Sequence, residues 1–201
     1  MGGVIHPSKI GLAVLISGWG SNLQSIIDAC RIDGFPAEIK VVISNIADAH
    51  GLVRAKDSGI PTRIVSHKNY SSKEDFEQNL LSVLGDYQID LVCLAGFMRI
   101  LSPMVTTPWE GRMINIHPSL LPKYRGLHAH ARAIENKDTE SGCSVHYVTS
   151  GVDEGEIILQ RRVPIYADDT PDNLSARVLE QEHIAYPEAI KIIAHRLAAH
   201  K

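Results

Sequence analysis

The first half of the chain alternates continuous apolar runs with stretches of helical periodicity. Five apolar runs predict buried strands, at residues 9–17, 37–44, 61–66, 89–97 and 112–117. Three segments between them repeat apolar residues at helical spacing, at residues 21–32, 48–59 and 71–87. Strands that alternate with helices predict a parallel sheet that is covered on both faces by right-handed crossovers.

The pattern changes in the second half of the chain. Residues 141–150 and 156–166 predict two strands joined by a loop or hairpin at GVDEG. A final helix is expected to begin with Thr170 as N-cap and Pro171 at its first position, and to run to the C-terminus with a kink at Pro187. We therefore expect one α/β domain with a Rossmann-like, mostly parallel sheet and a more irregular, partly antiparallel C-terminal half.

Composition narrows the class of protein. The chain has 201 residues, 44% of them hydrophobic, and its 20 Lys and Arg against 23 Asp and Glu give a net charge of -3. A balanced charge gives no general attraction to nucleic acid or to an anionic membrane. The three cysteines are far apart without a CxxC pair, and no apolar run is long enough to span a bilayer. We expect a soluble cytoplasmic protein with reduced thiols.

The stretch ISGWGSNLQ, residues 16–24, follows a predicted buried strand and opens a predicted helix. Free backbone N–H groups and the helix dipole favour an anion at such a point, and glycines let a phosphate approach closely. The dinucleotide fingerprint would need a glycine where Leu23 stands and an acid where Ser44 and Asn45 stand. A phosphate monoester at Gly20, Ser21 and Asn22 is therefore favoured over NAD, with a tight strand-to-helix turn as the structural alternative.

The run NIHPSLLPKYRG places Asn115 and His117 two residues apart at the end of a predicted strand. Side chains two apart on a strand point the same way, and open α/β sheets bind ligands beyond the carboxyl ends of their strands. An amide and an imidazole on one face can both reach the oxygen of a carbonyl under attack. Pro118 and Pro122 stiffen the backbone that leaves this candidate catalytic site.

An imidazole that acts as an acid at neutral pH needs a carboxylate that raises its pKa. The candidate is Asp153 in the glycine-flanked sequence SGVDEGE, with Glu154 and Glu156 as alternatives that the sequence alone does not rank.

Two further groups of residues give weaker indications of a binding site. His117, His128 and His130 could suggest a metal, but an HxH pair points to opposite sides of a helix and no HExxH spacing occurs, so we expect no metal. The sequence AGFMRILSP, residues 95–103, could line a pocket for a flat heteroaromatic ring around Arg99. Core packing explains that segment equally well.

Taken together, these motifs resemble those of the folate-dependent phosphoribosylglycinamide formyltransferase family. The resemblance runs from about residue 9 to the final helix and rests on five blocks in family order: LISGWGSNLQ, LAGFMRILSP, NIHPSLLPKY, SVHYVTSGVDEGEIILQ and ARVLEQEHIAYP. It implies transfer of a formyl group from 10-formyltetrahydrofolate to the amine of glycinamide ribonucleotide. It also implies a single formyltransferase domain over residues 1–201, with a phosphate-binding half at 9–117 and a folate and catalytic half at 118–201.

The resemblance assigns roles residue by residue. Gly20, Ser21 and Asn22 hold the substrate phosphate, and Glu182 holds its ribose hydroxyls. Asn115, His117 and Asp153 are the catalytic residues. The folate site is bordered by Lys73, Met98, Arg99, Ile100, Leu101 and Asn115. The resemblance alone selects Asp153 over Glu154, and it alone supplies Glu182.

The same resemblance implies two small-molecule substrates, no metal, no nucleic acid and no membrane partner, in a monomer or homodimer. Three positions depart from the family pattern: Trp19 stands at a variable position, Lys73 where Arg is frequent, and Arg125 where Pro is frequent. Arg125 looks more like the methionyl-tRNA formyltransferase branch. Alternative functions are a folate hydrolase, a formyltransferase with another amine acceptor, and a phosphate-binding module without catalysis.

Overall fold

Seven strands form one sheet in the computed structural model of the protein, which describes residues 9–198. The strands are β1 (Ile10–Ile16), β2 (Ala37–Ser44), β3 (Thr62–Ile64), β4 (Leu91–Leu94), β5 (Met113–His117), β6 (Glu140–Tyr147) and β7 (Ile157–Pro164). The helices are α1 (Ser21–Cys30), α2 (His50–Asp57), α3 (Lys73–Gly85), α4 (Pro103–Thr106), α5 (Ala129–Glu135) and α6 (Pro171–Ala198), with 3₁₀ turns η1 (His67–Asn69) and η2 (Thr107–Trp109).

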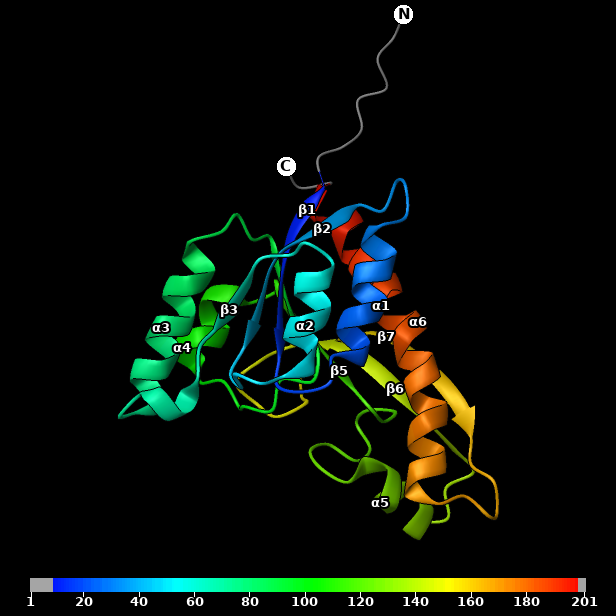
Figure 1. The fold of residues 1–201 in the computed structure, drawn as a ribbon. Helices are drawn as coiled ribbons and strands as arrows, with labels where there is room; N and C mark the ends of the chain where they lie inside the picture. The colour runs from blue at the N-terminus through cyan, green and yellow to red at the C-terminus, as the bar shows by residue number, and fades with distance from the viewer. Residues whose placement is uncertain (1–8, 199–201) are drawn as a thin grey trace, which may run out of the picture.

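The sheet has the strand order β3-β2-β1-β4-β5-β6-β7. Strands β1 to β5 pair in parallel, whereas β6 is antiparallel to both of its neighbours, β5 and β7. Figure 1 shows this change of direction as the long β6–β7 hairpin that extends from the parallel part of the sheet. The predicted α/β class, the mostly parallel sheet and the partly antiparallel C-terminal half are all confirmed.

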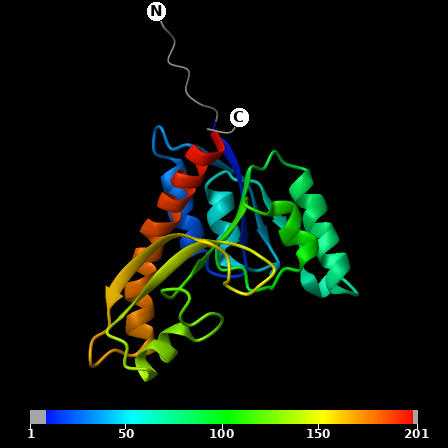
Figure 2. The same ribbon diagram turned by 180° about the vertical axis from the view of Figure 1, so that it is seen from behind.

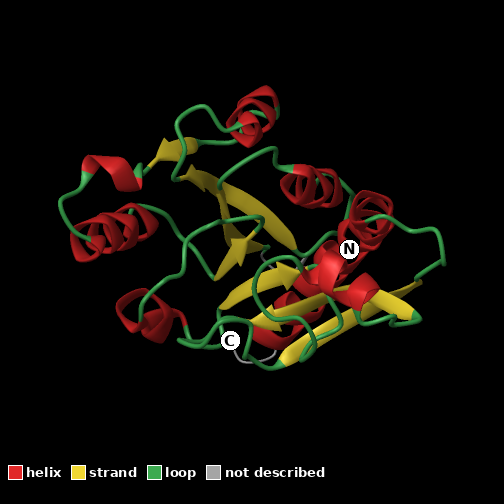
Figure 3. Cartoon of the chain, turned by 90° about the horizontal axis from the view of Figure 1, so that it is seen from below, coloured by secondary structure: helices red, strands yellow, loops and turns green. Residues whose placement is uncertain are grey.

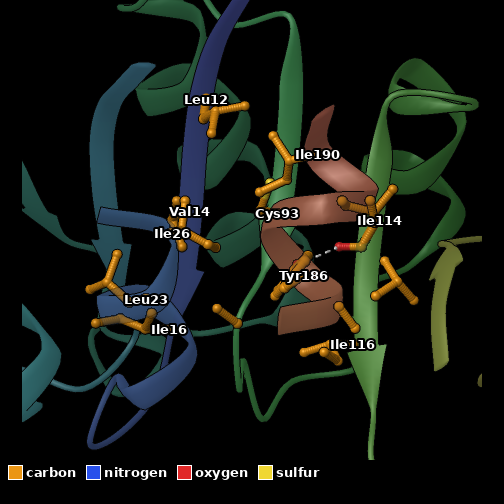
Figure 4. Packing of buried hydrophobic residues seen from close by; sticks show 14 of the residues in the cluster. Leu12, Val14, Ile16, Leu23, Ile26, Cys93, Ile114, Ile116, Tyr186 and Ile190 are labelled. Atoms are coloured by element: carbon orange, nitrogen blue, oxygen red, sulfur yellow. Dashed lines mark hydrogen bonds between the residues drawn. The ribbon is translucent and has the colours of Figure 1, made fainter. Parts of the chain in front are cut away.

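Helices cover both faces of the sheet, and this explains why the sequence of β1 is apolar throughout. Leu12, Val14 and Ile16 point into the core cluster that contains residues of α1, α2 and α6, while Ala13 and Leu15 point into the cluster formed with α3 and α4. A strand buried on both faces cannot alternate apolar with polar residues. Figures 1 and 2 show the two helix layers from opposite sides, and Figure 4 shows the first cluster from close by.

Helix α6 begins as its sequence predicts. Thr170 caps it, since the hydroxyl oxygen accepts a hydrogen bond from the backbone N–H of Asn173 at 3.2 Å. The helix then continues through Pro187, so the proline does not end it. Next to that proline, the buried hydroxyl of Tyr186 lies 2.8 Å from the carbonyl oxygen of Leu94. It also lies 3.3 Å from the carbonyl oxygen of Ile114 (Figure 4). These contacts fix the helix against β4 and β5.

Two predictions about secondary structure differ from what is observed. The strand expected at 89–97 is only Leu91–Leu94, because the chain turns at Gly96, whose φ of 77° is a left-handed conformation that suits glycine. Helices α4 and α5 were not predicted, since four and seven residues are too few to show helical periodicity. None of the helices within residues 9–198 is long and apolar enough to cross a membrane.

Candidate functional site

Most residues singled out by the sequence lie where the parallel strands end. At this edge of the sheet, β1 leads into α1 on one face while β4 leads into α4 on the other. Such a reversal between two neighbouring strands opens a crevice at their carboxyl ends, which is the usual ligand site of open α/β sheets. Figure 3 views the molecule from this side.

The predicted phosphate loop has the geometry of an anion site. Gly20 precedes α1 with a left-handed φ of 75°, and a Cβ atom there would lie 2.7 Å from the Cα atom of Gly51. Both facts require glycine at this position. The first turn of α1 carries Ser21 and Asn22 instead of acids, so its N–H groups and the positive end of the helix dipole face a place that suits a phosphate.

Asn22 and Glu182 meet beside this loop, although they are 160 residues apart in the sequence. The Asn22 Nδ2 atom donates a hydrogen bond of 2.6 Å to Glu182 Oε2. Both side chains are buried, and Asn22 Oδ1 has no hydrogen-bond partner among residues 9–198. Burial raises the pKa of Glu182, and the hydrogen bond from Asn22 opposes that rise. A carboxylate and a free amide oxygen next to an anion site are suited to the hydroxyls of a sugar phosphate.

Asn115 and His117 lie on one face of β5, as the spacing of two predicts. Their neighbours Ile114 and Ile116 point into the core beneath α6 on the other face (Figure 4). His117 is buried, and its Nε2 atom lies 2.9 Å from the carbonyl oxygen of Tyr124. The segment after β5 therefore folds back over the histidine ring.

Asp153 reaches His117 from the loop between β6 and β7. Its Oδ2 atom lies 3.2 Å from His117 Nδ1 and accepts a hydrogen bond of 2.8 Å from the backbone N–H of Gly126. Its Oδ1 atom lies 3.5 Å from His146 Nε2. Asp153 has a φ of 52°, a left-handed conformation that is rare outside glycine, asparagine and aspartate. The carboxylate is held from three directions, which fixes the orientation of His117.

The electrostatics of this pair differ in part from the expectation. Burial lowers the pKa of His117, while the carbonyl of Tyr124 and the charge of Asp153 raise it, and burial prevails. Asp153 thus acts in the expected direction without setting the net result. Burial also acts to raise the pKa of Asp153, but hydrogen bonds from His146 and Gly126 and the histidine charges outweigh it, so that pKa lies below its usual range. The carboxylate is ionised at neutral pH.

His146 also lies among these side chains, and the sequence did not predict its place there. It lies on β6 directly opposite Asn115, with its Nε2 atom 3.3 Å from Asn115 Nδ2 and its Nδ1 atom 2.8 Å from the carbonyl oxygen of Tyr147. Its Nε2 atom thus faces both Asn115 Nδ2 and Asp153 Oδ1, so the ring connects these two residues. One available signal was a histidine inside the otherwise apolar or small run SGCSVHY.

The segment at residues 98–101 divides between surface and core. Met98 and Ile100 are exposed beside the strand ends, and Arg99 is exposed between them, whereas the Leu101 side chain is only 5% exposed and packs in the core. The backbone N–H of Met98 donates a hydrogen bond of 2.7 Å to Ser17 Oγ at the end of β1. This bond links the segment to the start of the phosphate loop.

Lys73 begins α3 and lies beside a buried acid. Its Nζ atom is 3.7 Å from Glu77 Oε1. The Glu77 carboxylate in turn accepts hydrogen bonds from the backbone N–H of Ser102, at 2.8 Å, and from the Ser102 hydroxyl. Helix α3 is thereby tied to the residue that follows the 98–101 segment.

The alternative acid Glu154 has a different partner. Its Oε1 atom pairs with Arg125 Nη1 at 2.8 Å on the surface, so Asp153 is the acid that meets His117. His128 precedes α5 in a left-handed conformation, and His130 lies inside that helix. Within the described residues, no group of three histidine, cysteine or carboxylate side chains could hold a metal ion.

The chain is similar to known proteins over nearly its whole length. The formyl transferase family matches residues 10–190. A phosphoribosylglycinamide formyltransferase of Escherichia coli (strain K12) is 49% identical over 193 residues, which cover 96% of this chain and 91% of that protein. A trifunctional purine biosynthetic protein adenosine-3 of Homo sapiens is 49% identical over 189 residues, covering 94% of this chain and 19% of that protein.

Solved structures agree with these sequence matches. The crystal structure of phosphoribosylglycinamide formyltransferase from Brucella melitensis has a TM-score of 0.90 at 45% identity, covering 93% of this chain and 96% of that one. Glycinamide ribonucleotide transformylase 1 from Symbiobacterium toebii has a TM-score of 0.91 at 46% identity, covering 95% and 89%. The matched residues include the phosphate loop, the tip of β5 and the Asp153 loop. The chain belongs to the formyl transferase family.

Proposed function

We propose that this protein transfers the formyl group of 10-formyltetrahydrofolate to the amine of glycinamide ribonucleotide, a step of de novo purine biosynthesis. The observation that carries the proposal is that two groups of polar side chains lie at the same edge of one sheet: Asn22 with Glu182, and Asn115 with His117 and Asp153. The first group suits a sugar phosphate, and the second suits a carbonyl under attack. The family membership and the names of the relatives support the same conclusion.

The ribonucleotide binds across the two halves of the chain. Its phosphate accepts hydrogen bonds from the N–H groups of Gly20, Ser21 and Asn22 at the start of α1. Its ribose hydroxyls donate to Glu182, which enters from α6. Residues 9–117 thus supply the phosphate contacts, and residues 118–201 supply the carboxylate for the ribose.

The folate donor binds against the segment that follows β4. The exposed side chains of Met98 and Ile100 flank its pterin ring, and Arg99 lies between them. Leu101 contacts the ring through its backbone, since its side chain packs in the core. Lys73 supplies a positive charge near the same pocket, and Asn115 faces the formyl group.

Chemistry begins when the glycinamide amine attacks the formyl carbon. A carbon–nitrogen bond forms, and the carbonyl oxygen gains negative charge, which is stabilised by hydrogen bonds from Asn115 Nδ2 and His117 Nε2. The formyl oxygen replaces the Tyr124 carbonyl as the partner of Nε2. The bond from the formyl carbon to N10 of the folate then breaks, and a proton passes from the attacking amine through water to N10.

The lowered pKa of His117 has a consequence for this step. Burial disfavours a charged ring in the unliganded protein, whereas Asp153 on Nδ1 and the developing oxyanion near Nε2 both favour it. Protonation is therefore stabilised most in the transition state, where it accelerates the reaction. Asp153 also holds the ring so that Nε2 faces the substrate.

The test is an absorbance assay of folate deformylation with and without glycinamide ribonucleotide. Turnover that requires the ribonucleotide supports the proposal, while turnover without an acceptor identifies a hydrolase. His117→Ala is expected to leave the Kd of both substrates within several-fold and to lower kcat by about a hundredfold or more, since one oxyanion donor contributes ~3 kcal/mol. Full activity in this variant would contradict the proposed role of His117.

Methionyl-tRNA is tested as the acceptor in a separate experiment, because Arg125 is typical of the methionyl-tRNA formyltransferase branch. In this protein Arg125 is paired with Glu154. The same assay with formyl donor and methionyl-tRNA is expected to show no turnover. Activity with the tRNA and none with the ribonucleotide would replace the proposed acceptor.

A further inference from the structure

An exposed tryptophan stands in the phosphate loop, next to the residues proposed to bind phosphate. Trp19 is 67% exposed, and its indole ring stacks on the imidazole of His50, with centroids 4.3 Å apart and planes 11° from parallel. His50 is the first residue of α2, which follows a different strand. The stack therefore joins the β1–α1 loop to the start of another helix.

Arg54, one turn further along α2, reinforces this contact at two points. Its Nε atom donates a hydrogen bond of 3.0 Å to the carbonyl oxygen of Trp19, and its guanidinium carbon lies 5.8 Å from the indole centroid. Its Nη1 atom donates a hydrogen bond of 3.2 Å to Gln24 Oε1 in α1. One side chain thus holds both the loop and the helix that the loop opens.

The backbone of the loop is equally close to α2. The N–H of Gly51 donates a hydrogen bond of 3.0 Å to the carbonyl oxygen of Gly18. A Cβ atom on Gly51 would lie 2.5 Å from Ile16 Cδ1, and one on Gly20 would lie 2.7 Å from the Gly51 Cα atom. The loop and the start of α2 therefore approach so closely that a side chain at Gly20 or Gly51 would collide with its neighbours.

These contacts reduce the conformational entropy that the phosphate loop would lose when it binds a ligand. Glycine loses more conformational freedom than other residues when it is ordered, and Gly18 and Gly20 flank Trp19. A loop that is ordered before the ligand arrives does not lose that freedom on binding, which increases affinity. Within the described residues, no hydrogen bond or ring contact joins Trp19 to Asn115, His117 or Asp153.

We propose that Trp19, stacked on His50 and held by Arg54, is a positioning residue that orders the phosphate loop for the phosphate of the acceptor substrate. The proposal rests on the proposed function. Trp19→Ala removes the stack on His50 and is expected to raise the KM and Kd for glycinamide ribonucleotide about threefold to tenfold. The kcat at saturation and the KM for the folate donor stay within about twofold.

The decisive comparison uses glycinamide ribonucleotide and the same molecule without its phosphate. Isothermal titration of both ligands into the wild type and Trp19→Ala is expected to show a loss of affinity for the phosphorylated ligand only. Trp19→Phe keeps a stacking ring and is expected to restore most of that affinity. Arg54→Ala, which removes the second anchor, is expected to weaken the same ligand.

Tyr166→Ala is the matched control, because Tyr166 is also an exposed aromatic residue with an arginine, Arg177, 4.3 Å above its ring. It is expected to leave both affinities unchanged. Equal losses for the two ligands, a lower kcat, or no loss in Trp19→Ala would each overturn the proposal. If the wild type turns over the ribonucleotide and Trp19→Ala has the same affinity for it, only the role of Trp19 is refuted. If the wild type does not bind the ribonucleotide, the proposed function is refuted.

Discussion

Replacing Glu77 with glutamine tests how the segment at residues 98–101 is held. The Glu77 side chain is 1% exposed, and its two oxygens accept hydrogen bonds from the backbone N–H and the hydroxyl of Ser102. Glutamine has nearly the same shape but one acceptor oxygen and one NH₂ group. In Glu77→Gln, the amide oxygen accepts from the Ser102 N–H and the rotatable Ser102 hydroxyl accepts from the NH₂ group, so both hydrogen bonds remain but neither has a charged acceptor.

The magnitude follows from that loss of charge. Hydrogen bonds to a charged group contribute about 1.5–3 kcal/mol and neutral ones about 0.5–1.5 kcal/mol, so the change at two bonds is expected to lower the free energy of unfolding by about 2 kcal/mol. In a protein of 201 residues, each kcal/mol changes Tm by about 2–4 °C, which predicts a loss of about 4–8 °C. Because Ser102 directly follows the 98–101 segment, the KM for the folate donor is also expected to rise, with the KM for the ribonucleotide unchanged.

Urea unfolding and scanning calorimetry measure the first effect, and steady-state kinetics measure the second. Glu74→Gln is the matched control, since Glu74 is exposed on the same helix and its replacement is expected to stay within about 0.5 kcal/mol of the wild type. A Glu77→Gln protein with the Tm of the control would show that the carboxylate charge adds no strength to the Ser102 hydrogen bonds, and it would refute the reasoning.

Three further predictions concern charged residues. Asp153→Asn is expected to lower kcat by about a hundredfold or more without changing the ribonucleotide Kd, because it removes the charge that orients His117; an unchanged kcat argues against that role. Arg125→Ala breaks an exposed ion pair with Glu154, and such pairs contribute about 0–1 kcal/mol, so Tm and kcat should change little. A large loss of turnover would instead show that Arg125 takes part in catalysis. The Arg177 guanidinium lowers the pKa of Asp169 to about 2, so this pair stabilises the fold above about pH 4 and loses its effect as the pH falls through about 2. Urea unfolding across that range should show Asp169→Asn less stable than the wild type at pH 5 and converging with it at low pH, and a constant difference would contradict the linkage.

The parallel part of the fold was predictable because its physical causes are local. A strand buried on both faces, such as β1, must be apolar throughout, and a helix such as α1 must repeat apolar residues at its own period. The common orientation of Asn115 and His117 follows from the strand period alone. These features depend on residues close together in the sequence.

The rest of the site depends on contacts that no local pattern encodes. Asp153 and Glu154 are adjacent acids, and only the folded loop decides that the first meets His117 while the second meets Arg125. His146 enters the site because β6 is antiparallel to β5 and pairs opposite Asn115. The net fall in the His117 pKa likewise arises from burial in the assembled protein.

The contact between Asn22 and Glu182 has a consequence for the order of events during synthesis. Glu182 lies in α6, so the proposed acceptor site is incomplete until synthesis has passed α6 and this helix has packed against α1. A ribonucleotide that requires both residues binds only the fully folded protein. At a hundred times its Kd it would stabilise that state by about 2.7 kcal/mol, so the substrate supply would also set how long the enzyme survives proteolysis in the cell.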